Sequence, residues 1–204
     1  MITTMTAHPL IRRIEIPADA LVLLVGPAGS GKSTLAARLF PAESILSSDS
    51  LRAEVSGDPA NQAVSPIAFR ILHDRAGRRL ATGQLTVIDA TNIAASARRP
   101  LHRLAREHRR PVVAIVLDLP AELSLGRNAA RAERVVPEPA IRRQQAALRL
   151  ALDQGELEAE NLAALVVLAD PAEAEATTIR LTRVARAATL SPSALPRRIR
   201  RCMP

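Results

Sequence analysis

The 204-residue chain is nearly without aromatic side chains: Phe40 and Phe69 are the only two, and there is no Tyr or Trp. Proteins that bind single-stranded nucleic acid without sequence preference stack the bases on aromatic faces. This scarcity argues against a passive nucleic-acid-binding module. Any nucleic acid bound here must be held mainly by arginine side chains and backbone groups.

Cysteine and long apolar runs are also scarce. The one cysteine, Cys202, leaves no material for a disulfide framework or a thiolate metal cluster. No apolar run approaches the ~18 residues that a membrane span needs, and the residues near the N-terminus lack the pattern of a secretion signal. We therefore expect a cytoplasmic protein that does not associate with membranes.

Lysine is as rare as cysteine, because only Lys32 among the 28 basic residues is not an arginine. The net charge of +8 favours polyanionic partners, but four arginines within residues 197–201 supply half of it. The remaining excess also fits an ordinary nucleotide-binding enzyme. Charge alone does not decide between these classes.

The single lysine lies in a phosphate-binding motif. Residues 26–33, GPAGSGKS, match G-x-x-x-x-G-K-[ST] and directly follow the apolar run ALVLLV at residues 20–25. In such a loop the backbone N–H groups converge on a phosphate at the N-terminus of a helix. We expect Lys32 to bridge the β- and γ-phosphates of ATP or another NTP and Ser33 to bind Mg²⁺. The other nucleotide-binding residues are then Gly26, Ala28, Gly29, Ser30, Gly31 and Thr34.

Apolar strand patterns alternate with amphipathic helix patterns along the chain, which indicates right-handed βαβ units and a parallel sheet. We predict an α/β fold: a three-layer domain of the P-loop kinase type with a five-stranded parallel sheet and a helical lid that bears arginines. The expected strands are residues 20–25, 44–48, 85–89, 112–119 and 162–169. The expected helices are 32–40, one after Asp49, 65–82, 94–109, 120–134, 140–152 and 172–187.

These elements also predict the domain organisation. Residues 1–19 have no clear period and are interpreted as a lead-in to a single domain at residues 20–187, whose lid lies at about 120–152. Residues 188–204 are rich in proline and arginine and have too little apolar surface to pack, so we expect a disordered tail.

Two aspartates follow expected strands. Asp89 ends the strand LTVID and is the natural acidic partner of the metal ion, since ligands gather at the carboxyl ends of parallel strands. Asp49 follows the expected strand at residues 44–48 and could accept a hydroxyl proton. Arg52 lies one helical turn away and could hold an acceptor phosphate. The alternatives are that both aspartates only cap helices and that Arg52 is a solvated side chain.

Three arginines, Arg127, Arg131 and Arg134, are spaced to share one face of the helix after the fourth strand. Like charges in such a cluster repel one another unless an anion neutralises them. We interpret the three as lid residues that stabilise the transferring phosphoryl group. A merely solvated arginine face is the alternative in so arginine-rich a chain.

With these residues in place, the chain resembles the kinase domain of the bacterial polynucleotide kinase-phosphatase RNA repair family over about residues 20–186. The resemblance rests on GPAGSGKST, SSDSLR, the run from Asn61-Gln62 into AFRILH, GQLTVIDATNIAASARRPL and GRNAARAERVV. Gly126 departs from the family, where an acidic residue often precedes the first lid arginine. The phosphatase and ligase modules of the multidomain relatives have no counterpart in this sequence.

The resemblance implies transfer of the γ-phosphate of an NTP to a 5′-hydroxyl nucleic-acid end, with Asp49 as general base. It also implies that Arg52 contacts the acceptor strand, that Gln62 lines the acceptor groove, that Arg127 and Arg134 clamp the donor phosphates, and that the protein forms homo-oligomers. Two other functions remain open. A small-molecule P-loop kinase of a sugar or an antibiotic would use the same phosphate loop, and so would a non-catalytic nucleotide-binding regulatory protein.

Overall fold

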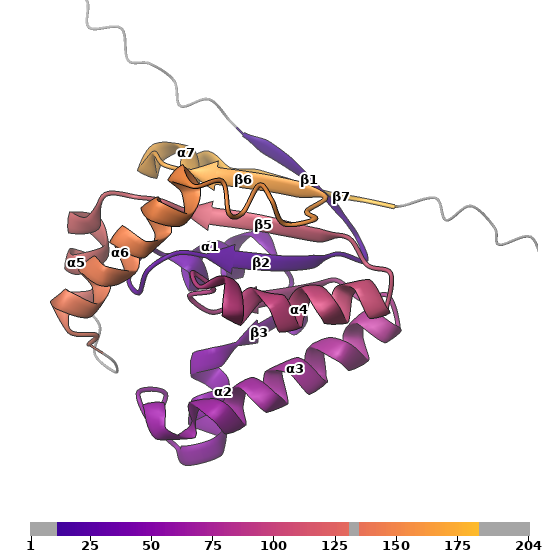
Figure 1. The fold of residues 1–204 in the computed structure, drawn as a ribbon, viewed down its shortest axis with the longest axis horizontal. Helices are drawn as coiled ribbons and strands as arrows, with labels where there is room; N and C mark the ends of the chain where they lie inside the picture. Colours follow the sequence, from indigo (N-terminus) through magenta and orange to yellow (C-terminus); the bar gives the residue numbers. More distant parts are fainter. Residues whose placement is uncertain (1–11, 131–134, 184–204) are drawn as a thin grey trace, which may run out of the picture.

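A five-stranded parallel sheet forms the centre of the protein (Figure 1). The computed structural model describes residues 12–130 and 135–183. The strands of the sheet are β2 (Leu21–Val25), β3 (Ile45–Ser47), β4 (Thr86–Asp89), β5 (Val112–Leu117) and β6 (Ala164–Leu168), in the order β3-β4-β2-β5-β6. The predicted α/β fold with five parallel strands is confirmed.

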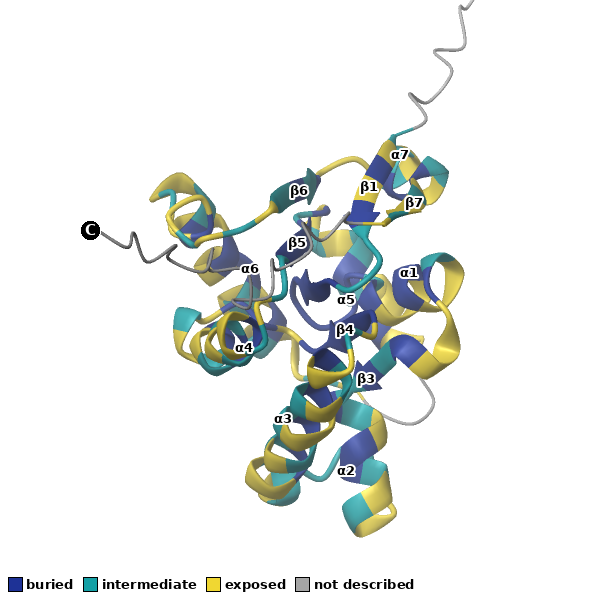
Figure 2. Ribbon diagram, turned by 90° about the vertical axis from the view of Figure 1, so that its right-hand side faces the viewer, coloured by how far each residue is buried: buried dark blue, intermediate teal, exposed yellow. Residues whose placement is uncertain are grey.

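Helices alternate with these strands and cover both faces of the sheet (Figure 2). They are α1 (Lys32–Leu39), α2 (Ser48–Ser56), α3 (Ser65–Ala81), α4 (Ala95–Glu107), α5 (Ala121–Ala129), α6 (Glu138–Asp153) and α7 (Pro171–Ala176), with short 3-10 turns at Ala42–Ser44 and Gln62–Val64. No helix in the described part of the chain is long and apolar enough to cross a membrane.

Strand β2 shows how the sequence builds two cores. All five of its residues are buried, and alternate side chains point to opposite faces of the sheet. Leu21 and Leu23 pack in one core with α3, α4 and α6, whereas Val22 and Leu24 pack in the other with α1 and α7. A strand that is apolar throughout is thus required at this central position.

A second, two-stranded parallel sheet joins the two ends of the described chain. It consists of β1 (Arg13–Pro17) and β7 (Thr178–Thr182). The segment that we interpreted as a lead-in therefore contains a strand, in which Ile14 and Ile16 are buried and alternate with exposed residues.

The helix expected over residues 172–187 is wrong for residues 178–182, which form β7, and residues 184–187 lie outside the described part. Helix α7 ends at Ala176 because the next residues, TIRLT, are rich in β-branched side chains and pair with β1. The lid helix expected over 120–134 ends at Ala129 in the structure, and residues 131–134 lie outside the described part. The predicted tail at 188–204 also lies outside it.

Candidate active site

The phosphate loop connects β2 to α1 in a conformation that two glycines make possible. Gly29 and Gly31 have φ angles of 80° and 97°, in the left-handed region that other residues rarely adopt. A Cβ atom on Gly29 would lie 2.1 Å from the backbone oxygen of Ser124 in α5. The loop is thus packed directly against the helix that follows β5.

Lys32 closes this loop from inside. Its Nζ atom donates hydrogen bonds to the backbone oxygens of Gly26 at 2.9 Å and Pro27 at 2.7 Å. The side chain is buried, with 7% of the residue exposed. The ammonium is therefore held on the concave side of the loop, where the anion of a nucleotide would lie.

Ser33 and Asp89 come together at the carboxyl edge of the sheet. The hydroxyl of Ser33 donates a hydrogen bond to Oδ2 of Asp89 at 2.7 Å. Asp89 ends β4, and its Cα pairs in register with Leu24 on one side and Ser47 on the other. The sheet therefore places Asp89 level with the start of the phosphate loop and the start of α2.

Burial raises the pKa of Asp89 above the ordinary value of an aspartate, and the nearby Asp49 carboxylate adds to the rise, while the Ser33 hydrogen bond and the Lys32 charge oppose it. A cation next to this carboxylate would offset the cost of burying its charge. Hydroxyl and carboxylate oxygens are the ligands that Mg²⁺ prefers. Ser33 and Asp89 thus fit a magnesium ion.

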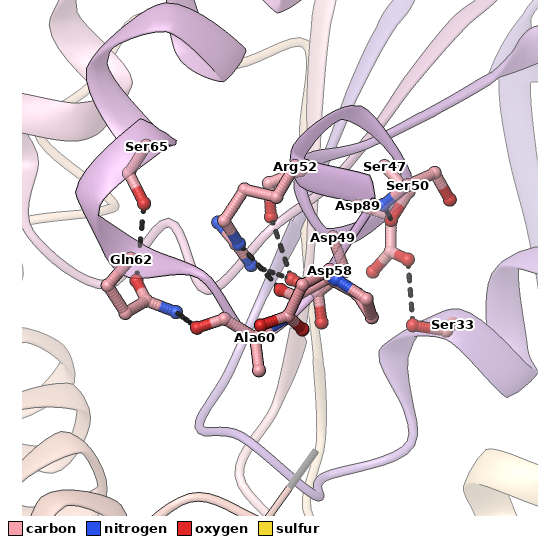
Figure 3. A network of polar contacts seen from close by, with 12 residues as sticks. Ser33, Ser47, Asp49, Ser50, Arg52, Asp58, Ala60, Gln62, Ser65 and Asp89 are labelled. Atoms are coloured by element: carbon pink, nitrogen blue, oxygen red, sulfur yellow. Dashed lines mark hydrogen bonds and ion pairs between the residues drawn. The ribbon is translucent and has the colours of Figure 1, made fainter. Parts of the chain in front are cut away.

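Asp49 and Arg52 lie one turn apart on α2 and form an ion pair (Figure 3). The guanidinium also donates from Nε to the backbone oxygen of Pro59 at 2.9 Å. The exposed fraction of the side chain is 40% for Asp49 and 4% for Arg52. A buried arginine thus holds an accessible carboxylate.

These positions test the interpretation of the aspartates as helix caps. The N-cap of α2 is Ser47, which accepts from the Ser50 N–H, and Asp49 is the second residue of the helix. The N-cap of α4 is Ala94, so Asp89 does not cap that helix. Arg52 is not a solvated side chain. The interpretations of Asp49 and Asp89 as simple caps, and of Arg52 as solvated, are wrong.

One cavity of about 170 Å³ collects the residues predicted for metal, base and acceptor. Gln62 lies at its edge, where it accepts a hydrogen bond from the Ser65 hydroxyl at 3.2 Å and donates to the Ala60 oxygen at 3.4 Å (Figure 3). The lining includes Ala28, Lys32, Ser33, Asp49, Arg52, Gln62, Asp89, Phe69 and Gln144.

Gln144 belongs to this cavity and was missed from the sequence. It lies on α6, and its Oε1 atom accepts a hydrogen bond from the Ala28 N–H at 2.8 Å. A helix at residues 140–152 was expected, but nothing in the pattern distinguishes Gln144 from Gln145. The structure does distinguish them, because Gln145 is buried and donates to Asp118 at 2.6 Å.

Of the three predicted lid arginines, Arg127 lies over the phosphate loop. Its Nη1 atom donates to the Ser30 backbone oxygen at 3.1 Å. It lines a second cavity of about 140 Å³ with Thr34 and Gly31. Arg131 and Arg134 lie outside the described residues.

A family model described as an AAA domain matches residues 21–151, from the first strand of the central sheet into the last turn of α6. The chain belongs to the AAA domain family. Within that family its fold is that of a P-loop kinase-like domain, with the loop, the sheet and the lid helices described above. No curated protein matches the sequence of this AAA domain protein.

Solved structures share this fold at low sequence identity. A chain from the Pnkp1/Rnl/Hen1 RNA repair complex is 22% identical over 76% of this chain and 49% of its own, with a TM-score of 0.58. A chain from AvrRxo1-ORF1:-ORF2 with ATP is 17% identical over 75% and 55%, with a TM-score of 0.58. A sugar kinase from Janibacter sp. HTCC2649 is 23% identical over 76% and 88%, with a TM-score of 0.50. The chain therefore spans about half the length of the first two, and the likeness establishes the fold alone.

Proposed function

We propose that the protein is a phosphotransferase that moves the γ-phosphate of ATP, or of another NTP, to the 5′-hydroxyl of a nucleic acid. One observation carries the proposal. The accessible carboxylate of Asp49 shares a cavity of about 170 Å³ with Lys32, Ser33 and Asp89. A nucleotide-binding regulatory protein has no need for a proton acceptor beside its phosphate loop.

In the proposed reaction Asp49 accepts the proton of the acceptor hydroxyl. The hydroxyl oxygen attacks the γ-phosphorus as the bond from that phosphorus to the β,γ-bridging oxygen breaks, and the nucleoside diphosphate leaves. Arg52 orients the carboxylate through their ion pair. Lys32 and Arg127 stabilise the negative charge on the phosphates, and Arg131 and Arg134 are proposed to assist them from the lid.

A magnesium ion, held by Ser33 and Asp89, would neutralise charge that develops on the β- and γ-phosphate oxygens. Asp89 then contributes a carboxylate that the sheet register fixes, and Ser33 a hydroxyl at the first turn of α1. Gln62 is proposed to contact the acceptor from the edge of the cavity. The polynucleotide acceptor itself rests on the resemblance of VIDATN and the neighbouring motifs to the RNA repair kinases.

A kinase of a small hydroxyl compound, such as a sugar, is the second candidate. The size of the cavity favours it, because about 170 Å³ is smaller than the ~300–1,000 Å³ of common ligand pockets and suits a small acceptor. Asp49, Lys32, Ser33 and Asp89 would serve the same roles. Only the acceptor differs between the two proposals.

The experiment is a transfer assay with γ-labelled ATP, Mg²⁺ and 5′-hydroxyl RNA and DNA oligonucleotides, each paired with the same oligonucleotide carrying a 5′-phosphate. We expect label on the 5′-hydroxyl strands and none on the 5′-phosphorylated controls. A panel of sugars and other small alcohols is run in parallel. Label on these compounds alone would replace the polynucleotide acceptor by the second candidate.

A further inference from the structure

A larger groove, of about 1070 Å³, lies between α4 and the segment that follows α6. One wall is α4, from Ala95 and Ser96 at its start to the turn beyond its end. The other wall includes Glu156, Ala159 and Glu160. None of the residues assigned above to the phosphate site lines this groove. Its walls carry five arginines: Arg99, Arg103, Arg106, Arg109 and Arg110.

The charge of this arginine groove is only partly balanced. Arg110 pairs with Asp19 at 2.7 Å, and Arg103 lies 3.8 Å from Glu107. In the described part of the chain, Arg99, Arg106 and Arg109 are exposed and have neither a hydrogen bond nor an ion pair from their side chains. Glu156 is the acidic residue of the groove that opposes them, because Glu160 is already paired.

The groove has a fixed shape, because a buried ion pair joins its two walls. Arg98 is fully buried, and its Nε atom donates to both carboxylate oxygens of Glu160, at 2.8 and 3.1 Å. His102 contacts the same carboxylate through Nε2 at 2.8 Å. A guanidinium remains charged when it is buried, so its burial is costly unless a carboxylate pairs with it. The position of Glu160 against α4 is thereby fixed, and with it the width of the groove.

The arginines follow a line along this wall. Arg99, Arg103 and Arg106 are spaced four and three residues apart, so they share one face of α4. Arg109 extends the line past the helix end, in a left-handed turn with φ of 53°, which a residue other than glycine rarely adopts. The 13 residues of α4 give a length of roughly 20 Å.

One end of the groove opens beside the candidate active site. Thr91 lines the cavity that holds Asp49 and Asp89, and Ala95 lines the groove. They are four positions apart, and four steps along an extended chain span at most ~14 Å. A polymer whose end lies in the active-site cavity can therefore continue into the groove, whereas a small acceptor cannot reach it.

We propose that the groove binds the phosphate backbone of the acceptor strand beyond the nucleotide that receives the phosphate. This inference rests on the proposed function and assigns the part of the acceptor site that lies beyond the active-site cavity. The line of arginines offers repeated contacts to a repeating anion, and no Phe, Tyr or Trp lines the groove for bases to stack on. Binding there is independent of sequence and sensitive to salt.

The test uses the full chain with Arg99, Arg106 and Arg109 all changed to Ala. The matched control changes Arg13, Arg180 and Arg183 to Ala. These three lie in and just after the β1-β7 sheet, outside the groove, and remove the same charge. Affinity is measured by fluorescence anisotropy with a labelled 5′-phosphorylated 15-nucleotide strand, so that binding is read without turnover.

For the groove variant we expect at least a tenfold loss of affinity for the long strand. The slope of log K against log salt should become shallower by about 2, since three lost contacts each contribute ~0.7 for single strands. In the transfer assay KM should rise for the 15-nucleotide acceptor and stay unchanged for a dinucleotide, with kcat unchanged for both. The control variant should lose much less affinity.

Equal loss of affinity in the groove variant and the control would overturn the inference, because bulk charge would then explain binding. Unchanged strand binding would overturn it too, as would loss only of binding to an acidic peptide such as oligoglutamate, which would assign the groove to a protein partner. Strand binding that depends on the groove without any transfer to 5′-hydroxyl ends would support the groove and refute the proposed kinase activity.

Discussion

The carboxamide oxygen of Gln144 accepts a hydrogen bond from the backbone N–H of Ala28 at 2.8 Å. Helix α6 of the lid region thus contacts the phosphate loop in the same cavity that holds Asp49 and Asp89. In phosphate loops such N–H groups point at the anion. The carboxamide of Gln144 therefore lies where the N–H of Ala28 points, next to the expected position of the nucleotide phosphates.

Changing Gln144 to Glu should lower kcat/KM for ATP at least tenfold, because the cavity would then hold a third carboxylate beside Asp49 and Asp89 and would repel the triphosphate. Gln144→Ala should cost less, about the 0.5–1.5 kcal/mol of one hydrogen bond. Steady-state kinetics with varied ATP measure both. Gln154→Glu, at the exposed C-terminal end of the same helix, adds the same charge and should leave the kinetics unchanged. Equal effects of the two Glu variants would exclude a local role for Gln144.

Asp49→Asn should reduce phosphoryl transfer by roughly 10²–10⁴-fold, the range for loss of a general base. Nucleotide affinity should be nearly unchanged, because the phosphates are expected to bind to Lys32 and the backbone of the phosphate loop. Titration calorimetry with ADP and the transfer assay separate the two effects. Asp74→Asn, an exposed change on α3, is the matched control. Lost ADP binding in Asp49→Asn would show that this carboxylate supports the donor site instead.

The sequence predicts the donor side of the site well because its determinants are local. The phosphate loop needs only a strand, a turn with glycines and a helix start, and residues 20–34 contain all three. The pairing of Ser33 with Asp89 also follows from the sequence, since carboxyl ends of neighbouring parallel strands share one edge.

Contacts between distant segments could not be predicted in this way. Gln144 reaches Ala28 from 116 positions away, and the partner of Arg98 is Glu160, 62 positions away. The β1-β7 pairing could not be predicted for the same reason, because the two strands lie far apart in the sequence. Arg13–Pro17 alternates buried and exposed residues over too short a stretch to identify a strand without its partner. Over residues 178–182 that tertiary pairing overrode the expected helix.

The buried carboxylate of Asp89 predicts a dependence of stability on pH in the absence of Mg²⁺. Its pKa is raised in the folded state, mainly by burial. A raised pKa means that the folded protein binds this proton more tightly than the unfolded chain. The contribution to stability is complete below the unfolded pKa and is lost as pH rises through the folded pKa.

Asp89→Asn should remove the loss of stability that occurs as pH rises, since the amide keeps the shape of the side chain without its charge. At neutral pH without Mg²⁺ the variant should unfold at a higher temperature than the wild type, and it should gain little from added Mg²⁺ and nucleotide. Thermal unfolding across pH, with and without Mg²⁺, measures both effects. Ser33→Ala provides a comparison that removes the hydroxyl and leaves the carboxylate. If Asp89→Asn lowers the unfolding temperature in metal-free buffer, the side chain is ionised and stabilising in the free protein, contrary to this account.

Lys32→Arg should abolish transfer, although the charge is kept. The Nζ atom of Lys32 fits between the backbone oxygens of Gly26 and Pro27, at 2.9 and 2.7 Å, in a buried position. A planar guanidinium is wider than an ammonium and directs its donors in a fixed fork, so it cannot contact both carbonyl oxygens and a phosphate from the same place.

The measurements are ATP affinity, kcat and the thermal unfolding temperature of the purified variant. Arg38→Lys, on the same helix, makes the reverse exchange at a site where the guanidinium donates to Ala174 and Thr177, so it should lower stability and leave kcat unchanged. Full turnover by Lys32→Arg with native stability would show that a guanidinium can replace the ammonium here, contrary to this account.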